Sequence, residues 1–200
     1  MPGYLPIQES RPDTVSVCCY LLYWQWSNMK QYYNTGIACA IDRLGPEDPE
    51  AAVSAIWIAI LSFTFPPVDG YLIQPEQATP GGFADLYMVH FDTKATSVSE
   101  YHFCIVQCKR VSAEGQASAW DEGRSQLRGY LPNLKPRNRA HTVYGVVAMG
   151  KWVEFYQYDR DAATGDEPLQ CLGPSTGKLH IAGQCGTIQR ILGGIKSNHT

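Results

Sequence analysis

Hydrophobic residues crowd the start of the chain at a spacing that is typical of a helix. Residues 14–33 (TVSVCCYLLYWQWSNMKQYY) follow Pro12, and Asp13 or Thr14 is in position to cap the first turn. The Tyr, Leu and Trp side chains of this segment are too dense for a fully exposed helix. We therefore expect an aromatic-rich N-terminal helix that packs onto the rest of the protein or forms a homodimer.

A second helix is predicted over Pro49–Phe63, after the turn-rich stretch IDRLGPEDPE. Asp48 is in position to cap it. Pro49 suits the first helical position, because the N–H that proline lacks has no partner there. Pro66 and Pro67 are expected to end the helix.

The spacing then changes to that of strands. Tyr71–Gln74 is a short apolar segment, Phe83–Phe91 alternates between apolar and polar residues, and Tyr101–Lys109 is mostly apolar. Because a strand that is buried on both faces loses the alternation, the third segment is predicted to lie in the interior of a sheet.

A helix and a strand pair follow. The helix is predicted over Ala117–Leu131, before Pro132, and the strands TVYGVVAMG and KWVEFYQYD meet at Gly150-Lys151 as a hairpin. The remaining residues predict a Gly/Pro/Asp-rich loop (160–178), an edge strand (LHIAG) and a closing helix (186–196).

This order of elements predicts a single α/β domain over residues 1–200, with a central mixed β-sheet flanked by helices. We divide it into an N-terminal helical extension (1–46), a core (47–158) and a C-terminal segment of loop, edge strand and helix (159–200).

The composition excludes some classes of protein. The chain has 200 residues, of which 44% are hydrophobic, and this is enough for one buried core. No stretch approaches the roughly 18 apolar residues of a membrane span, and the N-terminus lacks the basic and apolar regions of a signal peptide. The seven cysteines form no CxxC pair and are odd in number, which favours reduced thiols in an intracellular protein, cytoplasmic or nuclear.

Charge is unevenly distributed along the chain. The formal net charge is −3, and residues 1–108 carry eleven Asp/Glu against four Lys/Arg. Residues 109–151 carry eight Lys/Arg against three Asp/Glu. The acidic total does not favour a nucleic-acid binder, but the local basic segment keeps nucleic acid as a candidate partner.

Polar side chains gather on two of the predicted strands. Asp85 lies on one, and Gln107 and Lys109 project from a single face of the next, because side chains alternate along a strand. Cys108, between them, points the opposite way and is expected in the core. If the strands pair, the three polar residues converge. A carboxylate and a second oxygen ligand can hold Mg²⁺ or Mn²⁺, and a lysine beside them can stabilise a phosphorane-like transition state or position a water.

This arrangement resembles the PD-(D/E)xK nuclease superfamily over roughly residues 47–158, and more closely the fungal proteins that carry this fold. Asp85 stands for the first acid of the motif, although Ala84 precedes it in place of Pro. Gln107-Cys108-Lys109 stands for (D/E)xK, and Gln126-Leu127-Arg128-Gly129-Tyr130 matches the QxxxY helix motif of the RecB-like branch. The resemblance implies a restriction-endonuclease-like core.

The resemblance also implies an activity, a divalent-metal-dependent phosphodiesterase acting on nucleic acid. Its catalytic residues are implied to be Asp85, Gln107 and Lys109. Glu50 on the preceding helix, with Glu47 as the alternative, joins Asp85 and Gln107 as a ligand of Mg²⁺ or Mn²⁺. The implied substrate contacts are Gln126 and Tyr130, which share a helical face, together with Arg124 and Arg128.

The sequence departs from the family at Gln107, where the motif has a carboxylate. An amide oxygen can still ligate Mg²⁺, but the loss of one negative charge weakens the hold on the metal. Two alternatives therefore keep the fold and discard the metal. One is a specialised-metabolism enzyme whose small-molecule ligand meets Asp85, Lys109 and Gln126 as acid/base groups or hydrogen-bond donors. The other is a non-catalytic interaction domain.

Overall fold

The structure is a computed structural model. It describes residues 33, 36–80, 82–93, 97–137, 142–162, 167–174 and 177–199. The helix predicted over residues 14–33, its caps and the homodimer expected to form through it lie outside the described residues, apart from Tyr33.

Along the described chain, two α-helices are followed by three strands, a third α-helix, four strands and a last α-helix. The α-helices are α2 (Gly36–Arg43), α3 (Glu50–Thr64), α4 (Ala117–Tyr130) and α5 (Cys185–His199). Short 3-10 helices are η1 (Pro67–Asp69), η2 (Val111–Ala113) and η3 (Leu131–Asn133). The strands are β1 (Tyr71–Thr79), β2 (Gly82–Asp92), β3 (Ser99–Lys109), β4 (Val143–Met149), β5 (Trp152–Tyr158), β6 (Leu169–Cys171) and β7 (Leu179–His180).

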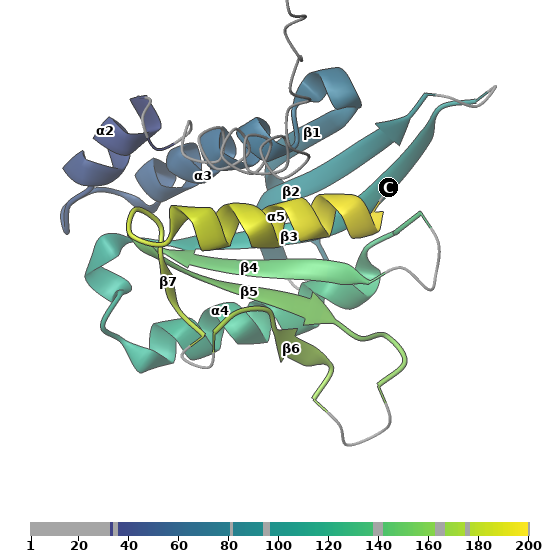
Figure 1. The fold of residues 1–200 in the computed structure, drawn as a ribbon. Coiled ribbons are helices and arrows are strands. Elements are labelled where there is room, and N and C mark those ends of the chain that lie inside the picture. Colours follow the sequence, from purple (N-terminus) through teal and green to yellow (C-terminus); the bar gives the residue numbers. More distant parts are fainter. Residues whose placement is uncertain are drawn as a thin grey trace, which may run out of the picture.

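The strands form one mixed sheet in the order β1-β2-β3-β4-β5-β6, and β7 also pairs with β5 (Figure 1). β1, β2 and β3 are antiparallel neighbours. β3 and β4 are parallel, and α4 provides the crossover that such a connection needs. β5 pairs antiparallel with β4, β6 and β7. The protein is therefore an α/β protein with a mixed sheet, as predicted.

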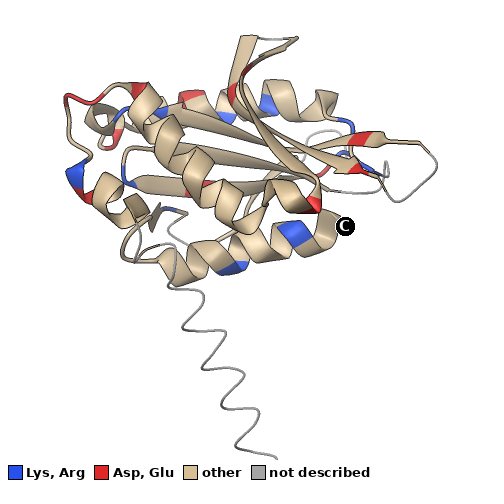
Figure 2. Cartoon of the chain, turned by 90° about the horizontal axis from the view of Figure 1, so that it is seen from above, with Lys and Arg blue, Asp and Glu red and all other residues tan. Residues whose placement is uncertain are grey.

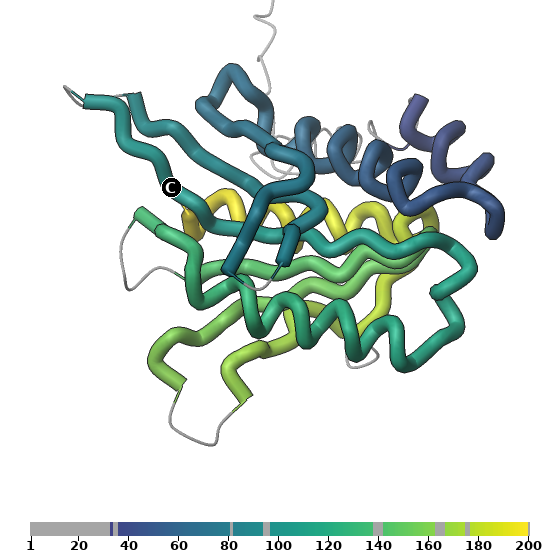
Figure 3. The backbone as a smooth tube through the Cα atoms, turned by 180° about the vertical axis from the view of Figure 1, so that it is seen from behind, coloured from purple at the N-terminus to yellow at the C-terminus, as the bar shows by residue number. Residues whose placement is uncertain are grey.

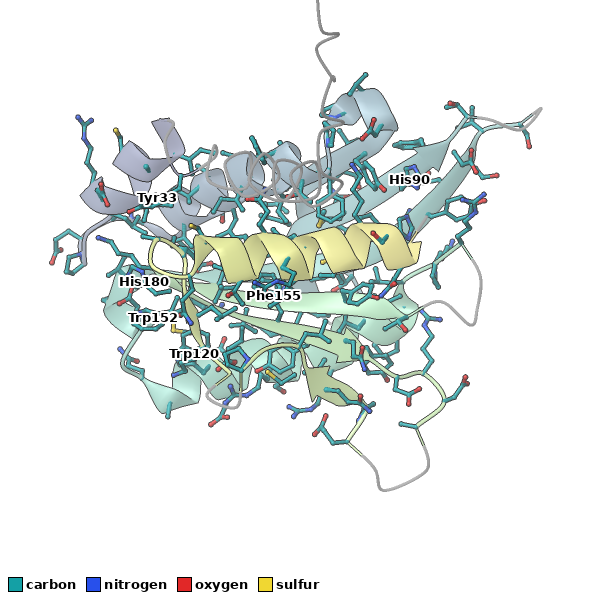
Figure 4. All side chains as sticks on the ribbon, in the orientation of Figure 1. Tyr33, His90, Trp120, Trp152, Phe155 and His180 are labelled. Carbon is teal, nitrogen blue, oxygen red and sulfur yellow. The ribbon has the colours of Figure 1, made fainter. Side chains whose placement is uncertain are left out.

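Helices cover both faces of the sheet. α3 and α5 pack on one face, where Trp57 and Phe155 meet edge to face at 6.1 Å between ring centroids. α4 packs on the other face, where Trp120 and Leu127 are fully buried. Figure 3 shows α4 on the opposite side of the sheet from α5, and Figure 4 labels Phe155 and Trp120, one from each cluster. Among the described residues, no helix combines the length and the apolar character needed to cross a bilayer.

The start of α3 differs from the prediction. The helix begins at Glu50, Pro49 occupies the N-cap, and no side chain caps the first turn. The Asp48 carboxylate accepts a hydrogen bond from the Gly45 N–H at 2.7 Å instead. The predicted cap at Asp48 is therefore wrong, because this carboxylate stabilises the preceding turn. The helix ends at Thr64, before Pro66.

Two strand predictions also need correction. β1 extends to Thr79 and not only to Gln74, because pairing with β2 continues through its polar residues to the turn. The predicted loop 160–178 contains the strand Leu169–Cys171, which the edge of β5 holds in place by backbone pairing. Both strands lack the apolar alternation from which a strand is usually recognised.

Candidate functional site

β2 separates from β3 near the end that carries the predicted catalytic residues. The antiparallel pairing runs as far as Leu86↔Val106, and one more step in the same register sets Asp85 beside Gln107. At that point the Asp85 carboxylate, and not a β2 carbonyl, accepts a hydrogen bond from the Cys108 N–H, at 2.7 Å. Asp85 therefore replaces a ladder bond at the point where the two strands part.

At the same place, the face of the sheet on which alternate β2 side chains lie changes. Leu86 packs with the α3/α5 cluster, whereas Ala84 packs with the α4 cluster. Residues two apart on a regular strand share a face. β2 is therefore twisted at Asp85, between Ala84 and Leu86. The Asp85 side chain is partly exposed there. Besides the hydrogen bond from the Cys108 N–H, its carboxylate oxygens have further lone pairs that can accept hydrogen bonds or bind a cation.

β3 presents Gln107 and Lys109 on its α4 face. Ile105 belongs to the α4 cluster and Cys108 to the α3/α5 cluster, so alternation directs Gln107 and Lys109 toward α4. The predicted core position of Cys108 is confirmed, since this residue is fully buried, and burial raises the pKa of its thiol.

The strand end is fixed by the β4–β5 turn. The Lys109 carbonyl accepts a hydrogen bond from Gly150 N–H at 2.9 Å, and the Glu114 carboxylate accepts one from Lys151 N–H at 2.6 Å. Gly150 has a φ of 55°, and a Cβ there collides with Glu114, so this turn requires glycine. Lys109 is held on a rigid element, and its side chain is 19% exposed.

Glu50 reaches the same region from the first turn of α3. Partial burial raises the pKa of its carboxyl group, and the negative charges of Asp85 and Glu122 raise it further. The positive charges of Lys109 and Arg110 act in the opposite direction. Such mutual effects require these groups to be near one another.

The Asp85 pKa is raised as well. Burial is the main cause and the negative charge of Glu76 adds to it, while the hydrogen bond from Cys108 and the charge of Lys109 oppose it. Two carboxyl groups with raised pKa values therefore share a region with one lysine. We refer to Glu50, Asp85, Gln107 and Lys109 as the divergence site.

Gln107 is the most unusual member of this site. It is 1% exposed, and its Nε2 is buried without a hydrogen-bond partner. Leaving a buried donor unpaired costs about 1–3 kcal/mol, and such groups in native structures call for an explanation. An oxygen atom of a ligand that reached the α4 face of β3 would satisfy this amide.

α4 adds two polar residues above the site. Glu122 Oε1 lies 3.9 Å from Lys109 Nζ and accepts a hydrogen bond from Gln126 Nε2 at 3.3 Å. Gln126 Oε1 is buried without a partner. Tyr130, one turn further on, is buried, and a Cβ at Gly82 would lie 2.7 Å from its hydroxyl oxygen. Gln126 thus connects to the site through Glu122, while the Tyr130 hydroxyl lies against the start of β2.

The two predicted arginine contacts point elsewhere. Arg124 donates to Glu154 at 2.8 Å and to Asp121 at 2.6 Å. Arg128 forms two hydrogen bonds with the Glu167 carboxylate, at 3.1 and 3.0 Å. Arg124 is therefore paired with acids on β5 and on α4 itself, and Arg128 with an acid just before β6. Glu47 lies on the exposed turn before α3.

The donor set of the divergence site fits a hard divalent cation. Mg²⁺ is commonly held by one or two carboxylates and completes its shell with water or substrate oxygens. Glu50 and Asp85 supply two carboxylates, and Gln107 supplies an amide. The described residues contain no group of three or more His, Cys, Asp or Glu side chains arranged to hold a metal ion. A cation here would therefore depend on the two carboxylates, the amide and non-protein oxygens.

Sequence reasoning missed three charged residues near the site, Glu76, Arg110 and Glu122. The carboxylates act on Asp85 and Glu50, and Arg110 acts on Glu50. Arg110 is exposed and directly follows Lys109. Only Glu122 had a usable signal, because it lies four residues before Gln126 on a predicted helix.

The described cavities lie away from the divergence site. One of about 580 Å³ lies between η1, the start of β1, the end of β2 and α5, with Tyr71, His90 and Lys196 in its wall. Figure 4 labels His90 near the end of α5. Another, of about 440 Å³, lies between α2 and α3 and is mostly apolar.

Comparisons of this chain with protein-family models, with curated proteins and with solved structures found no match.

Proposed function

We propose that the protein is a divalent-metal-dependent phosphodiesterase of the PD-(D/E)xK type that acts on nucleic acid, with the divergence site as its active site. The observation that carries the proposal is the grouping of Asp85, Lys109 and Glu50 where β2 and β3 separate. Asp85 accepts a hydrogen bond from the Cys108 N–H, and the charge of Lys109 lowers the pKa of both Asp85 and Glu50 against the effect of burial.

The order of elements supports the proposal. A helix with an acid (α3) precedes the strand with Asp85 (β2), the strand that ends in Lys109 (β3), the helix with Gln126 and Tyr130 (α4) and a strand parallel to β3 (β4). This is the order on which the resemblance to the nuclease superfamily rests. β1 is inserted between α3 and β2 as the first arm of a hairpin.

Each residue has a role that follows from its chemistry. Glu50 and Asp85 would hold the cation, and Gln107 would present its amide. A bound divalent cation supplies a Lewis acid and a water of lowered pKa. Lys109, held at the end of a rigid strand, places its ammonium where negative charge develops on the phosphoryl oxygens. The unpaired Gln107 Nε2 offers a donor to an oxygen of the substrate.

Fewer positively charged side chains are available to bind a substrate than the sequence predicts. Arg110 is exposed beside Lys109, whereas Arg124 and Arg128 are paired with acids. Figure 2 shows Lys and Arg interspersed with Asp and Glu over the described ribbon. We therefore propose that binding to nucleic acid is local and modest, and that it depends on the cation to offset the site's carboxylates.

A metal-independent small-molecule enzyme is the second candidate. The cavity of about 580 Å³ favours it, since this volume lies in the range of small-molecule sites and its wall includes the buried Tyr71. Its charged groups are paired with each other, Asp69 with Lys196 at 2.8 Å and Asp92 with Arg137 at 3.0 Å. Asp85, Lys109 and Gln126 do not line it, so this candidate needs different catalytic residues.

A cleavage assay tests the proposal. The full-length protein is incubated with end-labelled single- and double-stranded DNA and RNA, with Mg²⁺, Mn²⁺ or EDTA. We expect metal-dependent cleavage that Lys109→Ala slows about 10²- to 10³-fold while the circular dichroism spectrum is kept. Lys151→Ala is the matched control, because this lysine lies on the β4–β5 turn, and it should cleave like the wild type. No cleavage of any substrate with either metal, or equal cleavage by Lys109→Ala, would overturn the proposal.

A further inference from the structure

Further along the strands from the divergence site, a β-bulge interrupts the pairing of β2 with β3. Met88 pairs with Cys104, but the next pair is Val89 with His102, so β3 has one extra residue, Phe103. Phe103 and Cys104 accordingly both pack in the α3/α5 cluster, although consecutive residues of a regular strand point to opposite faces. β-Bulges redirect side chains in this way and are common beside active sites.

The bulge brings His102 to the α4 face of the sheet, beside Tyr87 of β2. Tyr87 packs against the α4 cluster, and the Tyr87 and His102 rings meet edge to face with 5.1 Å between their centroids. Because residues two apart on a strand share a face, Glu100 lies on that face as well. The backbone is fixed there, since the His102 N–H donates to the Lys135 carbonyl at 2.8 Å.

The side chains of Tyr87, His102 and Glu100 form one hydrogen-bonded chain, which we call the Tyr87 relay. The Tyr87 hydroxyl oxygen lies 3.0 Å from His102 Nδ1, and His102 Nε2 lies 2.8 Å from Glu100 Oε1. An ionised carboxylate only accepts hydrogen bonds, so His102 Nε2 carries a proton and donates it to Glu100. In the neutral imidazole, Nδ1 is then the acceptor, and the Tyr87 hydroxyl donates to it. The relay therefore directs the phenol proton toward a base.

This order of groups is that of an activated nucleophile. A nucleophile beside a base, with the base oriented by a third group, is the general pattern of covalent catalysis. Tyr87 needs the base, because burial raises the pKa of its phenol and the negative charge of Glu100 raises it further. Glu100 in turn stabilises the imidazolium that forms when His102 takes the proton. The His102 and Glu100 side chains are 21% and 49% exposed and Tyr87 is partly exposed, so the relay is accessible from solvent.

We propose that Tyr87 is the nucleophile of a second active site, which transfers acyl groups from uncharged esters to water. The inference goes beyond the proposed function and needs no cation. A neutral ester suits the relay better than a phosphodiester does, because the Glu100 carboxylate repels an anion.

The reaction has two steps. In the first, the Tyr87 oxygen attacks the acyl carbon and the phenol proton passes to His102 Nδ1; the ester C–O bond then breaks, and the leaving alcohol takes the proton from His102. In the second, His102 accepts a proton from water as the water oxygen attacks the acyl carbon of the acyl-tyrosine. The bond to the Tyr87 oxygen breaks, the phenolate takes the proton back from His102, and the carboxylic acid leaves. Phenols are more acidic than aliphatic alcohols, so the acyl-tyrosine is a reactive ester.

The test uses p-nitrophenyl acetate and the full-length protein in EDTA. We expect a burst of p-nitrophenol followed by slower steady release, with an acetyl group on Tyr87 located by mass spectrometry of proteolytic fragments. Tyr87→Phe should lose the burst, and His102→Gln should slow the acetylation of Tyr87 about 10²-fold. Tyr101→Phe is the matched control, because Tyr101 directly precedes His102 and is also partly exposed, and it should behave like the wild type. Circular dichroism and thermal melting establish that each variant is folded.

Glu100 acts through His102 as a positioning residue and has a readout of its own. Glu100→Ala should slow the acetylation of Tyr87 about fivefold, because a half-exposed charge contributes modestly. The ring nitrogen chemical shifts of His102 should change from those of the Nε2–H tautomer to those of a tautomer mixture, which a purely structural role of Glu100 would not require.

Several results would overturn the proposal. They are the absence of a burst in the wild type, acetylation of Tyr101 as fast as that of Tyr87, equal acetylation of Tyr87 in the wild type and His102→Gln, and an acetyl-Tyr87 that water does not remove. The proposed function is unaffected by each of these results, since EDTA keeps divalent cations from the divergence site.

Discussion

Two polar clusters lie at opposite ends of one row of the sheet and differ in how their charges are satisfied. Gln107, Val147 and Glu154 occupy one row across β3, β4 and β5, with the divergence site at one end and Glu154 at the other. Glu154 is 4% exposed, yet Arg124 and the Tyr156 hydroxyl both donate to its carboxylate. Its buried charge is fully compensated.

The divergence site has the opposite character. Its two carboxyl groups have raised pKa values, mainly through burial, and its amide nitrogen has no partner. The positive charge of Lys109 lowers the pKa of both carboxyl groups but does not offset their burial, and Lys109 Nζ also lies 3.9 Å from Glu122 Oε1 on α4. The Glu154 cluster therefore satisfies its charges within the fold, whereas we propose that the divergence site binds a ligand.

The largest effect is expected from the lysine. Lys109→Ala should lower the cleavage rate about 10²- to 10³-fold, because it removes a preorganised charge from the transition state. Mn²⁺ affinity should stay the same or rise slightly, since a positive charge leaves the site. Single-turnover cleavage and Mn²⁺ titration of one protein preparation separate the two effects, and loss of both together would count against a catalytic role.

The second effect falls on stability and not on activity. Glu154→Gln leaves Arg124 without its buried carboxylate and should reduce the free energy of unfolding by about 3 kcal/mol. Mn²⁺ affinity should not change, because Glu154 lies at the far end of the row. Urea unfolding measures the first quantity. A fall in Mn²⁺ affinity without a fall in stability would contradict the claim that Glu154 stabilises the fold and takes no part in cation binding.

The fold of this face was largely predictable from the sequence, and the site only in part. Tyr101–Lys109 was recognised as an interior strand because it is continuously apolar, and the Gly150-Lys151 turn because two β-rich segments flank it. Asp85, Gln107 and Lys109 followed from strand alternation.

Other features depended on tertiary contacts that no local pattern records. Asp48 matches a helix cap in sequence, but its carboxylate bonds to Gly45. Arg124 and Arg128 resembled phosphate contacts until Glu154 and Glu167 were seen to engage them. Glu76 was not predicted as a neighbour of the site. Its effect on Asp85 depends on the pairing of β1 with β2, which a polar stretch of sequence does not record.

The third prediction restores the missing charge. Gln107→Glu should tighten Mn²⁺ binding about tenfold, since a third carboxylate joins the site, and a tenfold change corresponds to about 1.4 kcal/mol. Without metal the same variant should be less stable at neutral pH than the wild type, because the new charge is buried among other acids. Titration and melting with and without Mn²⁺ check both parts; unchanged affinity would mean that position 107 does not face the cation.

The smallest effect is a pH dependence of stability. Because the fold raises the Glu50 pKa, the protonated form is favoured, and the contribution of this group is full below the ordinary carboxyl pKa. It is lost as the pH rises through the raised value. Without metal, Glu50→Gln should therefore gain up to about 1 kcal/mol over the wild type at pH 7, and the difference should vanish in acid. Urea unfolding between pH 4 and pH 8 measures this trend, and a difference that grows toward acid would have the wrong sign.

The most direct measurement is a calorimetric titration of the full-length protein with Mn²⁺, for the wild type, Asp85→Asn and Glu154→Gln. Asn keeps an oxygen that can accept the Cys108 N–H, so the first variant removes charge with little change in shape. We predict one saturable site in the wild type and in Glu154→Gln, and its loss in Asp85→Asn. Equal binding by the wild type and Asp85→Asn, or no binding by the wild type, would contradict it.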